Sequence, residues 1–331
     1  MANGTGNIHL TNSTLEPTDD VHYSVGMATF GIILAIWIIV VNGALIIGVL
    51  SSKDRRNNNF MLHIINIAVA DIFVGILVLP ILADYLLAGS WKLGAEACQF
   101  WVITDILMCT VSIIAIVMVS YDRFVYLVWP KFYTSGWKQY ILGSVMILIP
   151  WVVGLGLVLP LWLNGQSIHQ ESDCLVILNR DFRIVSCFVS FFVPAFFAIC
   201  LNFSVLLMLC VLRRRWQERY VPTAKRPARQ ILTVALVSLV FVLMWLPFFV
   251  LMMLQALNID EGISARMLEL SIWLGYLNSG VTPVLWLIYP LVRESYLDLV
   301  CCRKKTEKRP DDTRLSMIED LNDDTEMKEI N

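Results

Sequence analysis

Charged side chains are scarce in this chain. Asp, Glu, Lys and Arg make up 16% of the 331 residues, whereas apolar residues make up 57%, and the mean hydropathy is +0.68. These values exclude an ordinary soluble domain, in which about 25% of residues are charged. Seven apolar runs, each long enough to cross a bilayer, lie near 25–50, 60–87, 98–121, 140–163, 184–212, 231–257 and 267–290. The sequence therefore predicts an all-α membrane protein built as a bundle of seven transmembrane helices.

Several kinds of site are missing as well. The four histidines, at positions 9, 22, 63 and 169, are scattered, and no metal-ligand cluster or nucleophile–base pair is visible, so we expect no enzyme. The run 267–290 has no lysine to form a retinal Schiff base. No internal repeat appears, which disfavours a transporter made of duplicated halves. We also expect no nucleic-acid partner.

The positive charges are distributed unevenly. Of the 25 Lys and Arg residues, 21 lie in one set of connections and the C-terminal tail, and the other four are Lys92, Arg180, Arg183 and Arg266. The positive-inside rule then predicts a multi-pass plasma-membrane protein with an extracellular N-terminus and a cytoplasmic C-terminus. The polar residues 1–22 are the expected extracellular tail, without a cleavable signal peptide, and their two sequons make Asn3 and Asn12 candidate glycosylation sites.

The eight cysteines differ in their predicted surroundings. Only Cys98 and Cys174 face the oxidising side, so by elimination we expect a disulfide between them. The predicted transmembrane domain, 23–290, is followed by an amphipathic helix on the inner membrane surface, 291–302, and by a disordered cytoplasmic tail, 303–331. Cys301 and Cys302 lie beside basic residues, which favours palmitoylation and contact with membrane lipid; the alternative is two free thiols.

One carboxylate lies alone within an apolar run. Asp105 has no Lys, Arg or His in the run 98–121 to neutralise it. A charged side chain at the centre of a membrane helix costs roughly 2.5–3.5 kcal/mol on insertion scales, so it is a candidate functional site. The simplest partner is a cation that arrives from outside as a ligand. The alternative is a structural acid that accepts a hydrogen bond from a neighbouring tyrosine, for which Tyr276 is the candidate.

Short motifs follow one another along the apolar runs in a fixed order. They are Asn42-Gly43, Ala68-Val69-Ala70-Asp71, Asp122-Arg123-Phe124, Trp151, Pro194, Trp245-Leu246-Pro247 and Pro283. With these motifs the chain resembles the rhodopsin-like G-protein-coupled receptors over nearly its whole length, and within them the biogenic-amine group. Framework segments such as Asn57-Asn58-Asn59-Phe60 resemble histamine receptors of the third and fourth subtypes. The pair Phe248-Phe249 is instead similar to catecholamine and serotonin receptors.

The resemblance implies an amine pocket around Asp105. The expected ligand-binding residues are Asp105, Cys109, Ser186, Ser190, Trp245, Phe248, Phe249, Trp273 and Tyr276. Ser186 and Ser190 are four residues apart and hence on one helical face, where their hydroxyls either meet a ligand or bond back to their own helix. Aromatic rings stack on a ligand ring or contact its ammonium. The related histamine receptors carry an acid where this chain has Ser190, so the identity of the amine stays open.

A second acid, Asp71, marks an expected allosteric sodium site. The resemblance brings Ser112, Asn278 and Ser279 to it, and the alternative is a hydrogen-bonded network without an ion. No other metal or cofactor is expected. The family's usual Asn-Pro-x-x-Tyr motif is altered here to Thr282-Pro283-Val284-Leu285-Trp286, which lacks both the Asn and the Tyr. No acid lies near 226–228, so we expect weak restraint of Arg123 and some basal signalling.

The resemblance also implies the signalling parts of a receptor. Asp122, Arg123 and Phe124 are expected to couple to a heterotrimeric G protein, of the inhibitory class by resemblance alone, with arrestin and receptor kinases as further partners. The expected activation core is Ile113, Pro194, Phe241, Pro247 and Pro283. The predicted function is thus a G-protein-coupled receptor for a small cationic aromatic amine. The alternatives are a receptor for a peptide or lipid and a constitutively active receptor.

Overall fold

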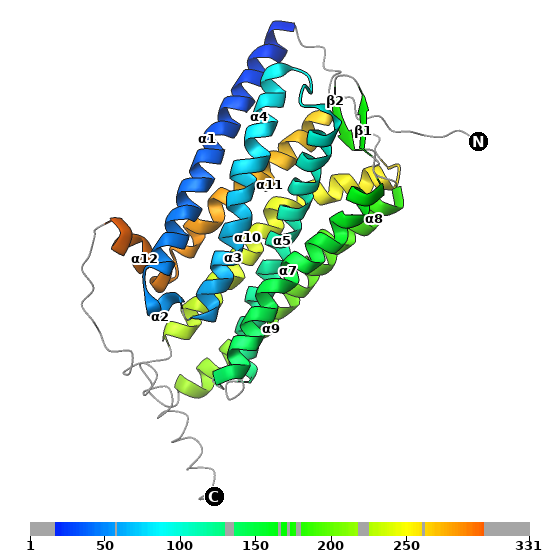
Figure 1. The fold of residues 1–331 in the computed structure, drawn as a ribbon. Coiled ribbons are helices and arrows are strands. Elements are labelled where there is room, and N and C mark those ends of the chain that lie inside the picture. Colours follow the sequence, from blue (N-terminus) through cyan, green and yellow to red (C-terminus); the bar gives the residue numbers. More distant parts are fainter. Residues whose placement is uncertain are drawn as a thin grey trace, which may run out of the picture.

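Helices account for nearly all of the structure, a computed structural model that describes residues 17–56, 58–129, 136–164, 167–170, 173–176, 180–217, 225–259 and 262–300 (Figure 1). The candidate glycosylation sites Asn3 and Asn12 and the candidate palmitoylation sites Cys301 and Cys302 lie outside these residues.

Seven helical rods lie side by side along the long axis of the molecule (Figure 1). They are α1 (Pro17–Leu50); α3 (Asn59–Phe73) with η1 (Val74–Val78) and α4 (Leu79–Ala88); α5 (Gly94–Val128); α7 (Gly136–Asn164); α8 (Arg180–Cys187) with η2 (Phe188–Phe192) and α9 (Val193–Gln217); α10 (Lys225–Ala256); and α11 (Ala265–Trp286). The short α2 (Lys53–Arg56) joins the first two rods, and α12 (Pro290–Val300) follows the last. The predicted helical bundle is confirmed.

The rods differ in how apolar they are. Six helices among the described residues are long and apolar enough to cross a membrane by length and composition alone, within Tyr23–Leu50, Asn59–Ala88, Gly94–Val128, Gln139–Leu163, Arg180–Val211 and Arg229–Ala256. The rod α11 is not among them because it carries Arg266 and Glu269 near its start and Asn278 and Thr282 further on. It is nevertheless packed against α10 and α1 as a full member of the bundle.

Two rods contain a wide helical turn just before a proline. The π-helical turn η1 precedes Pro80, and η2 precedes Pro194. Proline has no N–H to donate, and its ring clashes with the carbonyl four residues earlier, so a turn with an extra residue relieves the crowding. The turn η2 includes Ser190 and follows Ser186, so it sets how these two side chains enter the bundle.

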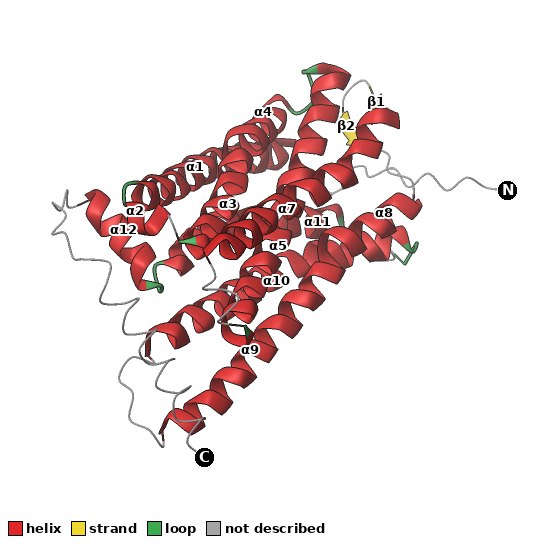
Figure 2. Cartoon of the chain, turned by 60° about the horizontal axis from the view of Figure 1, so that its bottom comes forward, coloured by secondary structure: helices red, strands yellow, loops and turns green. Residues whose placement is uncertain are grey.

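A small β-hairpin is the one departure from helix that the sequence did not predict. Strands β1 (Ser167–Gln170) and β2 (Asp173–Val176) pair antiparallel, with His169 opposite Cys174. Cys174 forms the predicted disulfide with Cys98 on α5, where the Cα atoms are 5.5 Å apart. The hairpin lies at one end of the bundle, and α2 with α12 lies at the other (Figures 1 and 2). We call these the hairpin end and the α12 end.

The helix α12 is fixed against α1 and α2. The Tyr296 hydroxyl donates to the Val41 carbonyl at 2.6 Å, and Arg55 on α2 pairs with Asp298 at 2.8 Å. Burial raises the pKa of Tyr296 to about 12, so its hydroxyl stays a donor. A Cβ on Gly48 would lie 2.7 Å from the carbonyl oxygen of Ser295, so only glycine allows this close approach.

Candidate functional site

The lone acid of α5 has only neutral partners. One oxygen of Asp105 accepts a hydrogen bond from the Tyr276 hydroxyl at 3.1 Å, and the other accepts from the Cys109 thiol at 3.7 Å. Asp105 forms no ion pair with any Lys, Arg or His among the described residues. Asp105 lies eleven positions into α5, toward the hairpin end. The Tyr276 contact expected for a structural acid is therefore present, and a cation that would balance the charge is not supplied by the described part of the chain.

Aromatic side chains of α11 lie next to this carboxylate. The rings of Tyr276 and Trp273 meet edge to face with centroids 6.0 Å apart, and Trp273 meets Phe30 on α1 at 5.5 Å. Both α11 residues are buried. Tyr276 thus contacts Asp105 directly. Trp273 packs against Tyr276 and toward α1.

A second aromatic cluster comes from α10. The ring of Trp245 lies 5.9 Å from the rings of both Phe248 and Phe249, measured between centroids. Phe191, which the sequence reasoning missed, stacks on Phe249 with centroids 4.5 Å apart and planes 5° from parallel. A Cβ on Gly275 would lie 2.7 Å from the Trp245 ring, so this glycine lets α10 approach α11 closely. Position next to Ser190 was the one signal that could have pointed to Phe191.

The two serines of the fifth rod differ in their surroundings. Ser190 is buried, and its hydroxyl accepts a hydrogen bond from Thr110 on α5 at 3.2 Å. The Thr110 hydroxyl is also 2.7 Å from the Ile106 carbonyl, so its single hydrogen is shared between two acceptors and it links α5 to η2 about one turn from Asp105. Ser186 is half-buried, and its side-chain hydroxyl makes no hydrogen bond within the part of the chain that the structure describes. Nothing in the sequence singles out Thr110, because threonines that bond to their own helix are common in spans.

Arg123 near the α12 end is held by several partners at once. Its Nε donates to Asp122 at 3.0 Å, its Nη2 bonds to the same oxygen, and its Nη1 donates to Gln230 of α10 at 2.8 Å. Its guanidinium also lies 4.3 Å from the ring centroid of Phe60. Gln230 in turn donates to the Tyr289 hydroxyl. Sequence reasoning looked for an acid on α10 and missed this neutral partner.

A family profile described as "7 transmembrane receptor (rhodopsin family)" matches residues 21–286. The chain belongs to the rhodopsin family of seven-transmembrane receptors. It is similar to the human histamine H2 receptor, at 27% identity over 308 residues that cover 87% of this chain and 85% of the relative. The guinea pig (Cavia porcellus) histamine H2 receptor is 26% identical over 304 residues, covering 87% and 83%. The human 5-hydroxytryptamine receptor 2C is 24% identical over 341 residues, covering 84% and 73%.

The family confirms several expectations from the sequence. This is a multi-pass membrane receptor and not an enzyme, and the resemblance to receptors for biogenic amines is confirmed by relatives named for histamine and 5-hydroxytryptamine. The finer likeness to histamine receptors of the third and fourth subtypes stays a prediction.

The acid of the second rod is surrounded by the expected hydroxyls. Asp71 is buried, with the side chains of Ser112 and Ser279 as hydrogen-bonding neighbours. Its Oδ2 atom is buried without a hydrogen-bond partner. Asn278, the fourth residue of the predicted set, is buried and accepts from Thr282 at 3.4 Å. A buried carboxylate oxygen without a partner, beside two hydroxyls, fits a hard monovalent cation, whose ligands are oxygens.

The predicted activation core is packed in the middle of the receptor. Ile113 and Phe241 are buried in one hydrophobic cluster with Trp245, and Pro194 is buried beside α5. Pro247 interrupts α10 and Pro283 interrupts α11. The Ser279 carbonyl, four residues before Pro283, accepts from the Asn42 amide at 3.1 Å, which restores a partner that the proline cannot supply.

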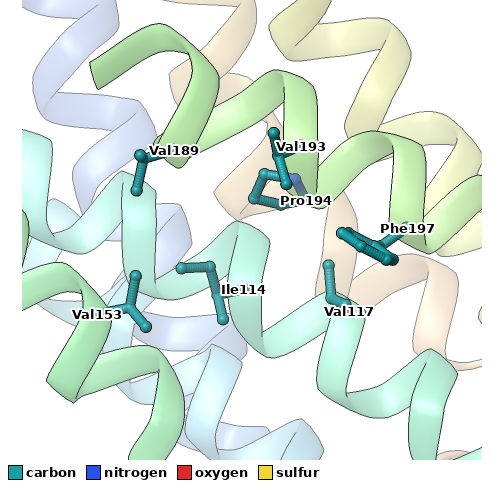
Figure 3. Close-up of a pocket in the computed structure, with 7 residues that line it drawn as sticks. All are labelled: Ile114, Val117, Val153, Val189, Val193, Pro194 and Phe197. Atoms are coloured by element: carbon teal, nitrogen blue, oxygen red, sulfur yellow. The ribbon is translucent and has the colours of Figure 1, made fainter. Parts of the chain in front are cut away.

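A groove of about 290 Å³ adjoins this core between α5, α7 and the fifth rod (Figure 3). Its lining side chains are all apolar: Ile114, Val117, Val153, Val189, Val193, Pro194 and Phe197. Ile114 lies nine residues from both Asp105 and Arg123 along α5. The groove is therefore far from both charged groups, and it contains no polar side chain that could bind an ammonium ion.

The remaining predicted residue packs elsewhere. Phe124 contacts a hydrophobic cluster of Val205, Leu209 and Ile231 and meets Trp129 edge to face. It therefore packs toward α9 rather than into the Arg123 hydrogen-bond network. The Nε2 atom of the buried His63 on α3 lies 3.8 Å from Oδ1 of Asp122, a neighbour that sequence reasoning did not predict.

Proposed function

We propose that this receptor binds a small cationic aromatic amine at the hairpin end and activates a heterotrimeric G protein at the α12 end. The supporting observation is Asp105, whose two oxygens meet, among the described residues, only the neutral donors Tyr276 and Cys109. An ammonium would form a charge-assisted hydrogen bond with this carboxylate in surroundings of low dielectric. Relatives named for histamine and 5-hydroxytryptamine are consistent with such a ligand.

The rest of the ligand would extend from Asp105 toward α10 and the fifth rod. Trp245, Phe248 and Phe249 offer ring faces and edges for an aromatic group. Ser190, which bridges to Thr110, offers a hydroxyl on the far side. An amine with a hydrogen-bonding aromatic ring satisfies both ends, and a sodium ion at Asp71 would act from a separate site.

Activation in this proposal is a population shift between two packings of the bundle. An agonist changes the balance only through its different affinities for the two packings. In the present packing Arg123 is 4% exposed and engaged by Asp122 and Gln230. A G protein, of the inhibitory class by resemblance, would bind the packing in which α10 has moved away. The N-terminus would then be extracellular, as the charge distribution predicts.

Substitution of Asp105 tests this function. Receptors with Asp105→Ala would be expressed in cells and challenged with a panel of biogenic amines, with G-protein activation as the readout. Removing one partner of a buried charge pair costs about 2–5 kcal/mol, so we expect the half-maximal amine concentration to rise by at least roughly 30-fold. Asp84→Asn is the matched control, because Asp84 is an exposed acid on α4, at the same end of the bundle as Asp105.

The outcomes separate the candidate ligands. An amine that activates the unaltered receptor and the Asp84→Asn variant, but not Asp105→Ala at equal surface expression, supports the proposal. An amine response that survives Asp105→Ala unchanged would reject it. A response to peptides or lipids alone would also reject it, in favour of a receptor for a non-amine ligand.

A further inference from the structure

We propose that Gln230 and Tyr289 are positioning residues that keep Arg123 inside the closed bundle. Their hydrogen-bonded chain, which we call the neutral latch, is Arg123–Gln230–Tyr289. The inference rests on the proposed coupling of Arg123 to a G protein. It replaces the expectation that Arg123 is only weakly restrained, which was based on the missing acid near 226–228.

The side-chain amide of Gln230 binds one hydrogen-bond donor and one acceptor. Its Oε1 accepts from Arg123 Nη1 at 2.8 Å, and its Nε2 donates to the Tyr289 hydroxyl oxygen. A guanidinium can only donate hydrogen bonds, and a neutral amide both accepts and donates, so glutamine can bridge an arginine and a tyrosine. The start of α10 has no acid near 226–228, and the uncharged Gln230 binds the arginine there instead.

Tyr289 is itself held from three sides. It lies in the turn between α11 and α12, where its N–H donates to the Trp286 carbonyl at 2.9 Å and its carbonyl accepts from Arg293 N at 3.0 Å. Its ring meets Phe60 edge to face at 5.2 Å, and it is 3% exposed. The Tyr289 hydroxyl that accepts from Gln230 is thus held in place by the backbone of the turn and by the Phe60 ring.

Phe60 completes the enclosure of Arg123. Its ring faces the guanidinium at 4.3 Å and also meets Trp286 at 5.9 Å. The latch thus connects α5, α10 and the turn before α12 across a ring from α3. An outward movement of α10 must break the Arg123–Gln230 bond, and a movement of the α11–α12 turn must break the Gln230–Tyr289 bond. Either movement alone frees the arginine only in part.

Four variants test the latch in a ligand-free assay of nucleotide exchange on a panel of purified heterotrimeric G proteins. Gln230→Ala should raise exchange per receptor by roughly tenfold or more, because a hydrogen bond to a charged group is lost. Tyr289→Phe should raise it by a smaller factor. The double variant should equal Gln230→Ala, because Tyr289 acts through Gln230. Gln230→Glu should lower exchange below that of the unaltered receptor, because an ion pair between the guanidinium and a carboxylate replaces the bond to a neutral amide.

The variant Gln230→Glu separates a positioning role from a folding defect. A positioning role predicts reduced exchange together with an unchanged melting temperature, whereas a damaged structure would also melt at a lower temperature. Gln139→Ala is the matched control, because Gln139 is a glutamine at the same end of the bundle that bonds Asn59 through its backbone carbonyl. Gln139→Ala should leave exchange unchanged.

A second measurement needs neither ligand nor G protein. Spin labels at Tyr140→Cys on α7 and Leu232→Cys on α10, both exposed, would report the distance between these helices, with Cys200, Cys210, Cys301 and Cys302 replaced by serine. Gln230→Ala should add a longer distance, and Gln230→Glu should not. Unchanged distances in Gln230→Ala would overturn the latch. Changed distances without exchange on any G protein would support the latch and reject the proposed coupling.

Discussion

If Asp105 is held for a ligand, then removing its charge should stabilise the ligand-free receptor. The perturbation is Asp105→Asn, which keeps the shape of the side chain and an oxygen that can accept from the Tyr276 hydroxyl, now at 3.1 Å. It removes a negative charge that is satisfied only by this hydroxyl and by the weak thiol donor of Cys109 at 3.7 Å. If the carboxylate of Asp105 served only a structural role, Asp105→Asn would instead lower the unfolding free energy of the receptor.

The size of the gain follows from these contacts. A central membrane acid costs roughly 2.5–3.5 kcal/mol on insertion scales. The two neutral hydrogen bonds offset part of this cost, at about 1 kcal/mol for a typical bond and less for the thiol. We therefore expect Asp105→Asn to raise the unfolding free energy of the empty receptor by about 1–2 kcal/mol. For a protein of 331 residues, such a change raises the melting temperature by about 1–3 °C.

Thermal unfolding of purified receptor in detergent, at one fixed heating rate, measures the effect. An activating amine at 100 times its Kd should stabilise the unaltered receptor by about 2.7 kcal/mol, and Asp105→Asn, whose affinity is at least roughly 30-fold weaker, by no more than about 0.9 kcal/mol. Asp84→Asn, at an exposed position, should melt like the unaltered receptor and keep the amine effect. A fall in melting temperature for Asp105→Asn would refute the reasoning, because it would show that the carboxylate is a satisfied structural group.

Two further predictions concern sites away from Asp105. If sodium binds at Asp71, replacing choline chloride by sodium chloride should raise the melting temperature of the unaltered receptor but not that of Asp71→Asn, and an equal rise in both would exclude the site. Gly48→Ala should lower the unfolding free energy by about 1–3 kcal/mol, since its Cβ would meet Ser295 at 2.7 Å. Gly43→Ala on the same helix, with nothing within 4 Å of its Cβ, should be close to neutral, and equal effects would show that α12 is not held by this contact.

The features that could be predicted from sequence depend on charge, length or compartment. Apolar runs locate the rods because a bilayer requires about 20 residues per span. Cys98 and Cys174 were paired by exclusion of the other thiols, and Asp105 was noticed because nothing in its run neutralises it. The rods and the disulfide between Cys98 and Cys174 are confirmed. The bond from Tyr276 was expected only in the alternative in which Asp105 is a structural acid, and it is present.

The features that were missed are uncharged and depend on two helices meeting. Thr110, Gln230 and Phe191 are ordinary residues along the sequence, and they become informative only beside Ser190, Arg123 and Phe249. Neutral polar residues in spans usually bond to their own helix, so their type alone predicts nothing about a partner. The β-hairpin was missed because its strands have four residues each, too few for a clear alternation of apolar and polar side chains.

The two ends of α5 present opposite electrostatic problems, and α10 connects them. Asp105 and Arg123 lie on one uninterrupted helix, roughly 27 Å apart at 1.5 Å per residue, so α5 alone offers no hinge between them. The helix α10 is tied at the hairpin end, where Arg180 donates to the Ala256 carbonyl at 3.0 Å, and at the other end by Gln230. Between the two ties it contains Pro247 and the Trp245 ring packed on Gly275.

A ligand that shifts Trp245 therefore acts at the proline between two fixed points, and the weaker tie must yield. The Arg180 tie is one hydrogen bond to a backbone carbonyl, whereas the latch is one neutral side-chain bridge that a G protein can replace with its own groups. Movement at the α12 end is thus the change that a bound partner can compensate, which is the condition for a ligand signal to become a binding signal.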